Sequence, residues 1–251
     1  MRRVVFNQKG GVGKTTTAVN VASCIALAGH RCLLVDVDAQ GNATSGLGLP
    51  APRTGGAHEL FFRPDRAAAS IRETDVPLLH LVPASRQLAS TDRELGKGPD
   101  ADIRLAKALN HLAALYEYVL LDCPPSLGLV PTNALAAAHA VIIPIQCEYY
   151  AMEGLAQMLD LLGRVQAQHN PGLRIAGILF TMYQAGVPYA DEVAEEIRNH
   201  FPDKVYTTTI PRDMLLSEAP SHGKSILDYA PRSPGAWSYI QLTKEIISHE
   251  G

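Results

Sequence analysis

The chain has 251 residues, of which 47% are hydrophobic and 19% charged, so it can bury a core without disulfides or a structural metal. Its 22 Lys and Arg residues against 25 Asp and Glu residues give a net charge of −3, which excludes a uniformly basic nucleic-acid coat protein. The composition also excludes a disordered or fibrous chain. We therefore expect one α/β domain over residues 1–251, with any nucleic-acid contact confined to a local patch.

Short runs of β-branched residues alternate with longer amphipathic segments, which predicts a mainly parallel twisted sheet with helices on both faces. The predicted strands are Arg3–Asn7, Cys32–Asp36, Leu79–Pro83, Tyr118–Asp122, Val141–Ile145, Arg174–Thr181 and Val205–Thr209. The predicted helices are Thr15–Ala28, Asp102–Leu115, Met152–His169, Tyr189–His200 and Gly235–His249. The stretch Gly41–Arg66 holds eight Gly or Pro residues and little periodicity, so we expect a long loop or a set of short turns there.

A glycine-rich loop, KGGVGKTT over Lys9–Thr16, joins the first predicted strand to the first predicted helix. Glycines let successive backbone N–H groups turn inward around phosphate oxygens, Lys14 supplies a charge to the β- and γ-phosphates, and the Thr15 hydroxyl is placed to bind Mg²⁺. A plain glycine-rich turn is the alternative, but the Gly-Lys-Thr ending between a strand and a helix favours nucleotide binding. The predicted nucleotide-binding residues of the loop are Lys9, Gly10, Gly11, Val12, Gly13, Lys14, Thr15 and Thr16.

Carboxylates stand at the ends of two predicted strands, at the sheet edge where α/β proteins bind ligands. Asp36 and Asp38 are two residues apart and share one face of their strand, and Asp122 closes the apolar run Tyr118–Leu121. Either turn capping or a role at a bound nucleotide fits Asp36 and Asp38. For Asp122 the second role is favoured, because Mg²⁺ at the phosphates requires a carboxylate.

The loop departs from the standard GxxxxGK[ST] pattern, since Gln8 occupies the first glycine position and an additional lysine, Lys9, begins the loop. In this form it resembles the deviant Walker A box of the ParA/MinD family of P-loop ATPases. Further segments resemble the ParA/Soj partitioning branch of that family, in the same order along the chain: LLVDVDAQGNATSGLG (33–48), VLLDCPPSLG (119–128) and IPRDMLLSEAPSHGKSI (210–226). The resemblance covers nearly the whole chain. It implies a three-layer α/β/α P-loop fold, ATP and ADP as ligands with Mg²⁺, ATP hydrolysis, and a homodimer with ATP.

The resemblance also implies residue roles at the phosphates. Lys9 would reach across a dimer interface to the partner's nucleotide, as an arginine finger does elsewhere, and Gly10 beside it would tolerate no side chain. Asp38 would orient or activate the attacking water. The implied catalytic residues are Lys9, Lys14 and Asp38, and the implied metal site is Thr15, Asp36 and Asp122.

The resemblance also implies that Pro211 and Asp213 contact the adenine ring of the nucleotide. The family contacts the base there largely through backbone and a side-chain amide, whereas this chain has an acid. A carboxylate accepts a hydrogen bond from the adenine amino group but cannot donate one.

Two other functional classes of the family are disfavoured by the sequence. A membrane-binding, MinD-like ATPase needs a basic amphipathic C-terminal helix, yet Lys244–Gly251 holds one lysine and two glutamates. A redox ATPase needs cysteines that bridge a cluster, and Cys123 beside Asp122 does not match that pattern. The four cysteines form no CxxC and are expected to be reduced core thiols. With no apolar region of signal-peptide length after Met1, we expect a cytoplasmic protein without membrane contact.

A partitioning switch with a ParB-like stimulatory partner is therefore favoured, with a plasmid, a chromosome or a protein assembly as cargo. Nonspecific DNA, and hence the bacterial nucleoid, is its expected matrix, although relatives usually carry arginine at the positions of Gly186 and Leu215. Between Arg198 and Glu245 there are six basic and five acidic residues, a weak electrostatic footprint. The DNA-binding candidates are Arg198, Lys204, Arg212, Lys224 and Arg232. The alternatives are the same ATP switch acting through a protein partner without DNA, or a MinD-like membrane-associated ATPase.

Overall fold

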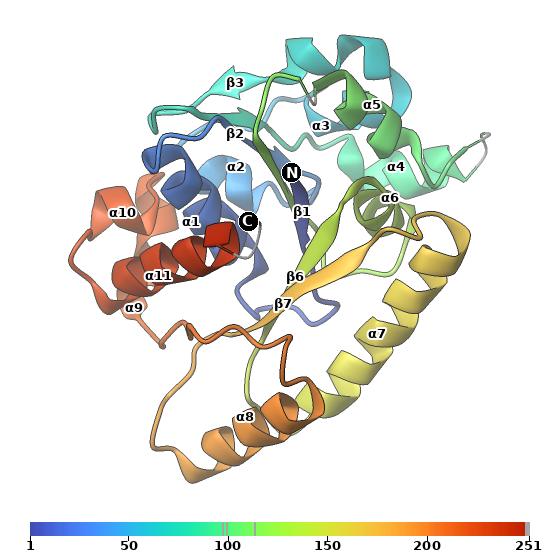
Figure 1. Ribbon diagram of the computed structural model, residues 1–251. Coiled ribbons are helices and arrows are strands. Elements are labelled where there is room, and N and C mark those ends of the chain that lie inside the picture. Colours follow the sequence, from blue (N-terminus) through green and yellow to red (C-terminus); the bar gives the residue numbers. More distant parts are fainter. Residues whose placement is uncertain (97, 99, 113, 249–251) are drawn as a thin grey trace.

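The computed structural model describes residues 1–96, 98, 100–112 and 114–248, arranged around a seven-stranded sheet (Figure 1). The strand order is β3-β4-β2-β5-β1-β6-β7, and all neighbours are parallel except the β3–β4 pair. The strands are β1 (Arg2–Val5), β2 (Cys32–Asp36), β3 (Arg72–Glu73), β4 (Leu79–Val82), β5 (Tyr118–Asp122), β6 (Ala140–Ile145) and β7 (Arg174–Phe180). The phosphate-loop strand β1 is therefore central, with β5 and β6 on its two sides.

Helices cover both faces of the sheet, as predicted. The longer helices are α1 (Lys14–Leu27), α4 (Leu88–Leu95), α5 (Arg104–Leu112), α6 (Leu129–Ala137), α7 (Ala151–Gln168), α8 (Pro188–His200) and α11 (Pro234–Ser248). The shorter ones are α2 (Asn42–Gly46), α3 (Ala57–Phe62), α9 (Met214–Glu218) and α10 (Ile226–Tyr229), with 3₁₀ turns η1 (Pro64–Ser70) and η2 (Ala219–His222).

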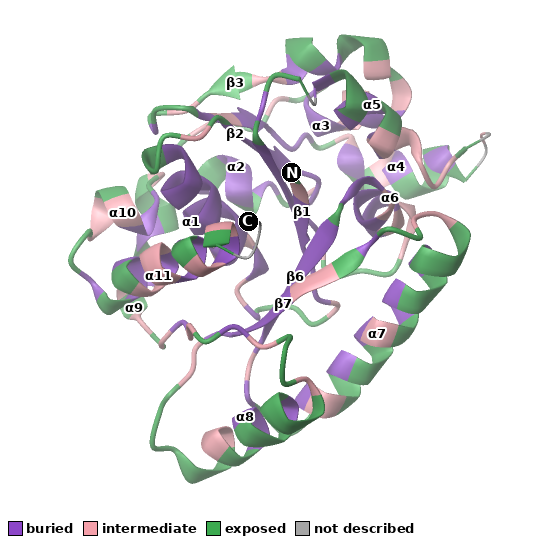
Figure 2. Cartoon of the chain, viewed as in Figure 1, coloured by how far each residue is buried: buried purple, intermediate pink, exposed green. Residues whose placement is uncertain are grey.

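Two apolar cores lie on opposite faces of the sheet, because successive strand residues point to opposite sides. Val4 packs with residues of α3–α8 in one core, while its neighbour Val5 packs with residues of α1 and α9–α11 in the other. Figure 2 shows the buried strands between the helices, whose outer faces are exposed. The three-layer α/β/α prediction is confirmed.

Most predicted elements are present with ends shifted by one or two residues, and two strands, β2 and β5, match to the residue. The helix predicted over Asp102–Leu115 is shorter, Arg104–Leu112, and Ala113 lies outside the described residues. His249, the predicted end of the last helix, also lies outside them.

The strand predicted over Val205–Thr209 is wrong. Only Val205 forms a bridge, to Ile178 of β7. The Tyr206 N–H still donates to the Ile178 carbonyl at 3.0 Å, but those of Thr207 and Thr208 donate to a side chain instead, the Glu245 carboxylate of α11, at 2.6 and 3.1 Å. A β-branched run therefore became an irregular segment because a helix supplied its hydrogen-bond acceptors.

Of the two expectations for Gly41–Arg66, one long loop is wrong, since the stretch contains the short helices α2 and α3 and the start of η1. Gly41 and Gly56 precede the two helices with positive φ values of 67° and 58°, so these glycines begin short helices rather than prolong a loop. Helices α4 and α6 and strand β3 were not predicted. Helix α6 is apolar nearly all round, which hides a helical period.

The four cysteines are buried and free, as predicted. Burial raises the pKa of the Cys24 and Cys147 thiols to about 11 and those of the other two further still. Across the described ranges, no helix is both long enough and apolar enough to cross a membrane.

Candidate functional site

The phosphate loop joins β1 to α1 through backbone conformations that only glycine adopts readily. Gly11 and Gly13 have φ values of 76° and 82°, and the helix begins at the next residue, Lys14. Backbone N–H groups at such a helix start form an anion-binding site. A Cβ added at Gly10 would meet no atom of the chain within 4 Å, so a steric constraint on Gly10 can come only from another molecule.

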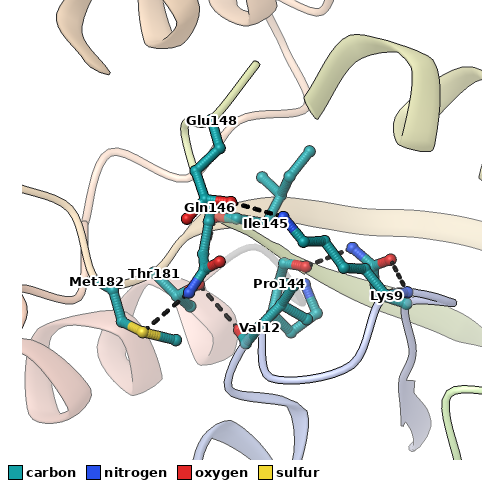
Figure 3. A network of polar contacts seen from close by, with 9 residues as sticks. Lys9, Val12, Pro144, Ile145, Gln146, Glu148, Thr181 and Met182 are labelled. Carbon is teal, nitrogen blue, oxygen red and sulfur yellow. Dashed lines mark hydrogen bonds and ion pairs between the residues drawn. The ribbon is translucent and has the colours of Figure 1, made fainter. Parts of the chain in front are cut away.

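The two lysines of the loop lie in different environments. Lys14 is buried, and its Nζ donates to the carbonyl oxygen of Lys9 at 2.8 Å; burial lowers its pKa. Lys9 is half exposed and its Nζ lies 2.6 Å from Glu148 Oε2, as Figure 3 shows. The Lys9 N–H donates to Asn7 Oδ1 at 3.0 Å, and Asn7 Nδ2 donates to the Pro144 carbonyl at 2.7 Å. The backbone at Lys9 is thus fixed while its side chain extends outward.

Residues that directly follow β6 and β7 contact the phosphate loop or one another beside it. None of them was predicted from the sequence as a site residue. Thr181 Oγ1 lies within hydrogen-bond distance of the Val12 carbonyl, 2.9 Å, and of the Ile145 carbonyl, 3.2 Å (Figure 3). Next to it, Met182 has a φ of 50°, and its sulfur accepts from Gln146 Nε2 at 2.9 Å. A non-glycine residue in this backbone region marks a constrained site. No local pattern distinguishes these residues from ordinary strand ends.

The carboxylates Asp36 and Asp122 are fully buried and stand opposite each other in the register of β2 and β5. Burial raises the pKa of Asp36 to about 6, although Thr44 hydrogen bonds lower it. Burial, and then the charge of Asp36, raise the pKa of Asp122 well above its usual range, against the lowering effect of Thr15. Asp38, also buried, follows at the same edge.

The two buried carboxylates differ in their partners. Asp36 accepts hydrogen bonds from Thr44 at one oxygen and from the Asp38 N–H at the other. Neither oxygen of Asp122 has a hydrogen bond of ordinary geometry within the described part of the chain, although the Thr15 hydroxyl is near enough to lower its pKa. A buried carboxylate so weakly hydrogen-bonded, beside a hydroxyl, fits a cation. Among the described residues there is no group of three His, Cys, Asp or Glu side chains that could hold a metal ion.

A pocket of about 490 Å³ extends from the start of α1, a size common for small-molecule sites. Its walls come from five places: the loop with the first two turns of α1, helix α2, the residues after β7, the segment 210–224, and Tyr239 of α11. They include Gly13, Thr15, Thr16, Asn20, Asn42, Ser45, Gly46, Thr181, Met182, Pro211, Arg212, Asp213 and Lys224.

Pro211 and Asp213 both line this pocket, but the Asp213 side chain is engaged elsewhere. Its Oδ1 accepts from the Leu215 N–H at 3.0 Å and caps α9, and its Oδ2 accepts from the Gly235 N–H at 2.9 Å near the start of α11. The carboxylate thus fixes two helices.

The basic candidates are not all near the pocket. Arg212 and Lys224 line it, but Lys204 lines a separate hollow with Met1, at the other end of the strands. The Arg198 guanidinium lies 5.0 Å from the centre of the Phe180 ring, and Arg232 is exposed. Leu215 is partly buried against the core that contains α1.

A central strand that runs through a glycine loop into a helix, with buried carboxylates at the ends of neighbouring strands, defines a P-loop nucleotide-binding protein. A family model described as an AAA domain matches residues 3–175. The chain belongs to the ParA/Soj family of P-loop ATPases, and the resemblance found in the sequence is confirmed. It is, like that family, an ATPase.

Three relatives illustrate the match. The sporulation initiation inhibitor protein Soj of Bacillus subtilis is 48% identical over 246 residues, 98% of this chain and 97% of the relative. The chromosome partitioning protein ParA of Myxococcus xanthus is 44% identical over 98% of this chain and 87% of its own length. A crystal structure described as cobyrinic acid a,c-diamide synthase from Mycobacterium smegmatis, with bound ADP and magnesium, is 32% identical with a TM-score of 0.86, covering 99% and 94%.

Proposed function

We propose that this ATPase is a switch that dimerises with ATP, hydrolyses it to ADP and phosphate, and so partitions a chromosome, a plasmid or another cargo. The observation that carries the proposal is the outward position of Lys9. Its backbone belongs to the phosphate loop, yet its side chain is half exposed and paired with Glu148. A cation in this position can contact the phosphates of a nucleotide bound to a second subunit.

At the nucleotide we assign roles to the residues that surround the pocket. Lys14 contacts the phosphates of its own subunit, and the Thr15 hydroxyl and Asp122 hold Mg²⁺, directly or through water. Mg²⁺, when bound, neutralises charge on the phosphates. Asp38 orients the attacking water. Asp36 stabilises the segment that follows it, because its carboxylate accepts hydrogen bonds from the N–H groups of Asp38 and Thr44.

The sheet order supports an interface at the phosphate loop, because the loops after β5, β1 and β6 lie side by side. They present Leu127, Tyr149 and Tyr150 with 64%, 76% and 67% of their surface exposed. Large apolar side chains with this exposure suit a partner surface. The ion pair between Lys9 and Glu148 is half exposed, so its loss costs about 1 kcal/mol or less. Lys9 can therefore leave Glu148 for a partner's phosphate.

Sedimentation tests the dimer. Asp38→Ala protein with ATP and Mg²⁺ should form a stable dimer, because ATP binds but is not hydrolysed, and the same protein with ADP should be a monomer. Lys9→Ala is the matched variant, which should bind ATP and remain a monomer. A monomeric Asp38→Ala protein at saturating ATP would contradict the proposal.

We propose nonspecific DNA as matrix and a ParB-like protein as the stimulatory partner. Arg212 and Lys224 line one wall of the pocket, so a nucleotide bound there would lie beside them. A gel-shift with nonspecific duplex DNA, with ATP and with ADP at two salt concentrations, tests the matrix. Equal binding with ATP and ADP, or none at low salt, would favour the switch that acts through a protein alone.

A further inference from the structure

Thr44 is polar, lies in α2, and has no exposed surface. Its hydroxyl donates to Asp36 Oδ2 at 2.7 Å, and its backbone N–H donates to the same oxygen at 2.8 Å. The hydroxyl oxygen in turn accepts from the Ala84 N–H, just after β4, at 2.9 Å. One side chain therefore joins the end of β2, helix α2 and the segment after β4, and its hydroxyl both donates and accepts.

The Asp36 carboxylate holds both ends of the segment 37–44. Its second oxygen accepts from the Asp38 N–H at 3.2 Å, while Thr44 occupies the first. Inside the segment, Asp38 Oδ1 accepts from the Gln40 N–H, and the Asp38 carbonyl accepts from the Gly41 N–H, both at 2.9 Å. The segment is thus folded around one buried carboxylate.

This segment connects two parts of the site. Asp38 is buried at the phosphate edge, where it is a further cause, after burial and Asp36, of the raised pKa of Asp122. On the other side of Thr44, residues Ser45 and Gly46 line the nucleotide pocket, as does Asn42. A change in the conformation of the segment would move Asp38 relative to the phosphates.

We propose that Thr44 is a positioning residue for ATP hydrolysis: by bonding Asp36 and accepting from Ala84, it keeps the segment 37–46 in one conformation and holds Asp38 at the phosphates. This inference rests on the role proposed for Asp38. It does not depend on dimerisation or on DNA.

Thr44→Val separates this role from simple packing. Valine has nearly the same shape and is β-branched, but it leaves the Ala84 N–H without its acceptor and Asp36 with one donor fewer. Thr44→Ser retains the hydroxyl. Thr91→Val is the matched control, because Thr91 is equally buried but its hydroxyl contacts only the Gln87 carbonyl within α4, at 3.5 Å.

We expect Thr44→Val to lower kcat about 10- to 100-fold, since misplacing a catalytic group by about 1 Å has effects of this size. Its Kd for ADP measured in EDTA should change by about threefold or less, because the phosphate loop is untouched. Thr44→Ser and Thr91→Val should resemble the wild type. Sedimentation under the assay conditions ensures that the same ATP-bound species is compared. A wild-type kcat for Thr44→Val, or an equal loss in Thr44→Ser, would overturn the proposal.

Asp38→Ala separates this proposal from the one it rests on. If Asp38→Ala still hydrolyses ATP, the role of Asp38 is wrong; if Asp38→Ala is inactive while Thr44→Val is fully active, only the role of Thr44 is wrong. Hydrogen exchange supplies a readout that needs no turnover. In the nucleotide-free wild type the amides of Asp38 and Thr44 should exchange slowly, and Thr44→Val should speed exchange across 37–46. Fast exchange at both amides in the wild type would overturn the proposal even if the variant does not fold.

Discussion

The two ends of the nucleotide pocket are built in different ways. The phosphate end is one run of eight residues between β1 and α1, held from the side by Asn7 and Thr181. The base end is formed by the segment 210–224, whose short helices depend on contacts from elsewhere, such as the link from Asp213 to Gly235. The phosphate end is defined mainly by the backbone conformation of its loop, whereas the base end depends on contacts between residues far apart in the sequence. Substitutions should therefore affect binding at the phosphate end and stability at the base end.

The largest effect is expected at the phosphate end. Lys14→Ala should weaken ATP binding by about 100-fold or more, because a buried charged contact to phosphate contributes about 3 kcal/mol. Lys9→Ala should leave the affinity nearly unchanged, since this side chain extends away to Glu148. Calorimetry of both variants measures the difference. Equal losses of affinity would show that both lysines contact the nucleotide of their own subunit.

The carboxylates beside the phosphate end predict an unusual pH dependence of stability. In the unfolded chain the pKa of an aspartate is near 3.8, whereas burial raises the pKa of Asp36 in the fold to about 6 and that of Asp122 well above its usual range. Between these values the folded protein binds more protons, so the free energy of unfolding falls as pH rises from about 4 to 7.

Asp122→Asn should remove part of that fall and stabilise the nucleotide-free protein at pH 7.5, because the buried amide carries no charge that burial disfavours. Melting curves in EDTA at pH 4.5 and 7.5 measure the effect. Asp203→Asn, on the exposed surface, is the control and should keep the wild-type pH dependence. A wild type that becomes more stable over this range would contradict the prediction.

At the base end, Asp213→Ala should destabilise the fold by about 1–2 kcal/mol, because it removes the α9 cap and the bond to Gly235. Its effect on ATP affinity should be much smaller than that of Lys14→Ala. Asp213→Asn keeps a capping oxygen and should lose less stability. Urea unfolding and calorimetry separate the two quantities, and a large loss of affinity without destabilisation would place the carboxylate on the base instead.

The smallest effect is expected from Leu215→Arg, next to that cap. Each new phosphate contact should steepen the slope of log K against log salt by about 0.9 when DNA binding with ATP is measured. The wild-type slope should be shallow, because Lys204 lines a separate hollow, away from Arg212 and Lys224. A wild-type slope steeper than about −6 would show that the existing residues form a sufficient patch.

The difference between the ends also explains what could be predicted from sequence. The phosphate loop and the strands ending at Asp36 and Asp122 follow from local chemistry, since their residues are contiguous and their conformations are characteristic. Thr181 and Thr44 act through partners many residues away, so no local pattern indicates them. The strand predicted over Val205–Thr209 failed for the same reason, because the Glu245 carboxylate that binds its backbone comes from the last helix.

The burial of all four cysteines has a practical consequence. A thiol reacts as its thiolate, and burial keeps these groups protonated and shielded at neutral pH. A single cysteine introduced at an exposed position outside the proposed interface, such as Asp203, would therefore be the one thiol that a maleimide dye modifies readily. Fluorescence energy transfer between two such labelled chains could follow their association in real time, with the native cysteines left in place.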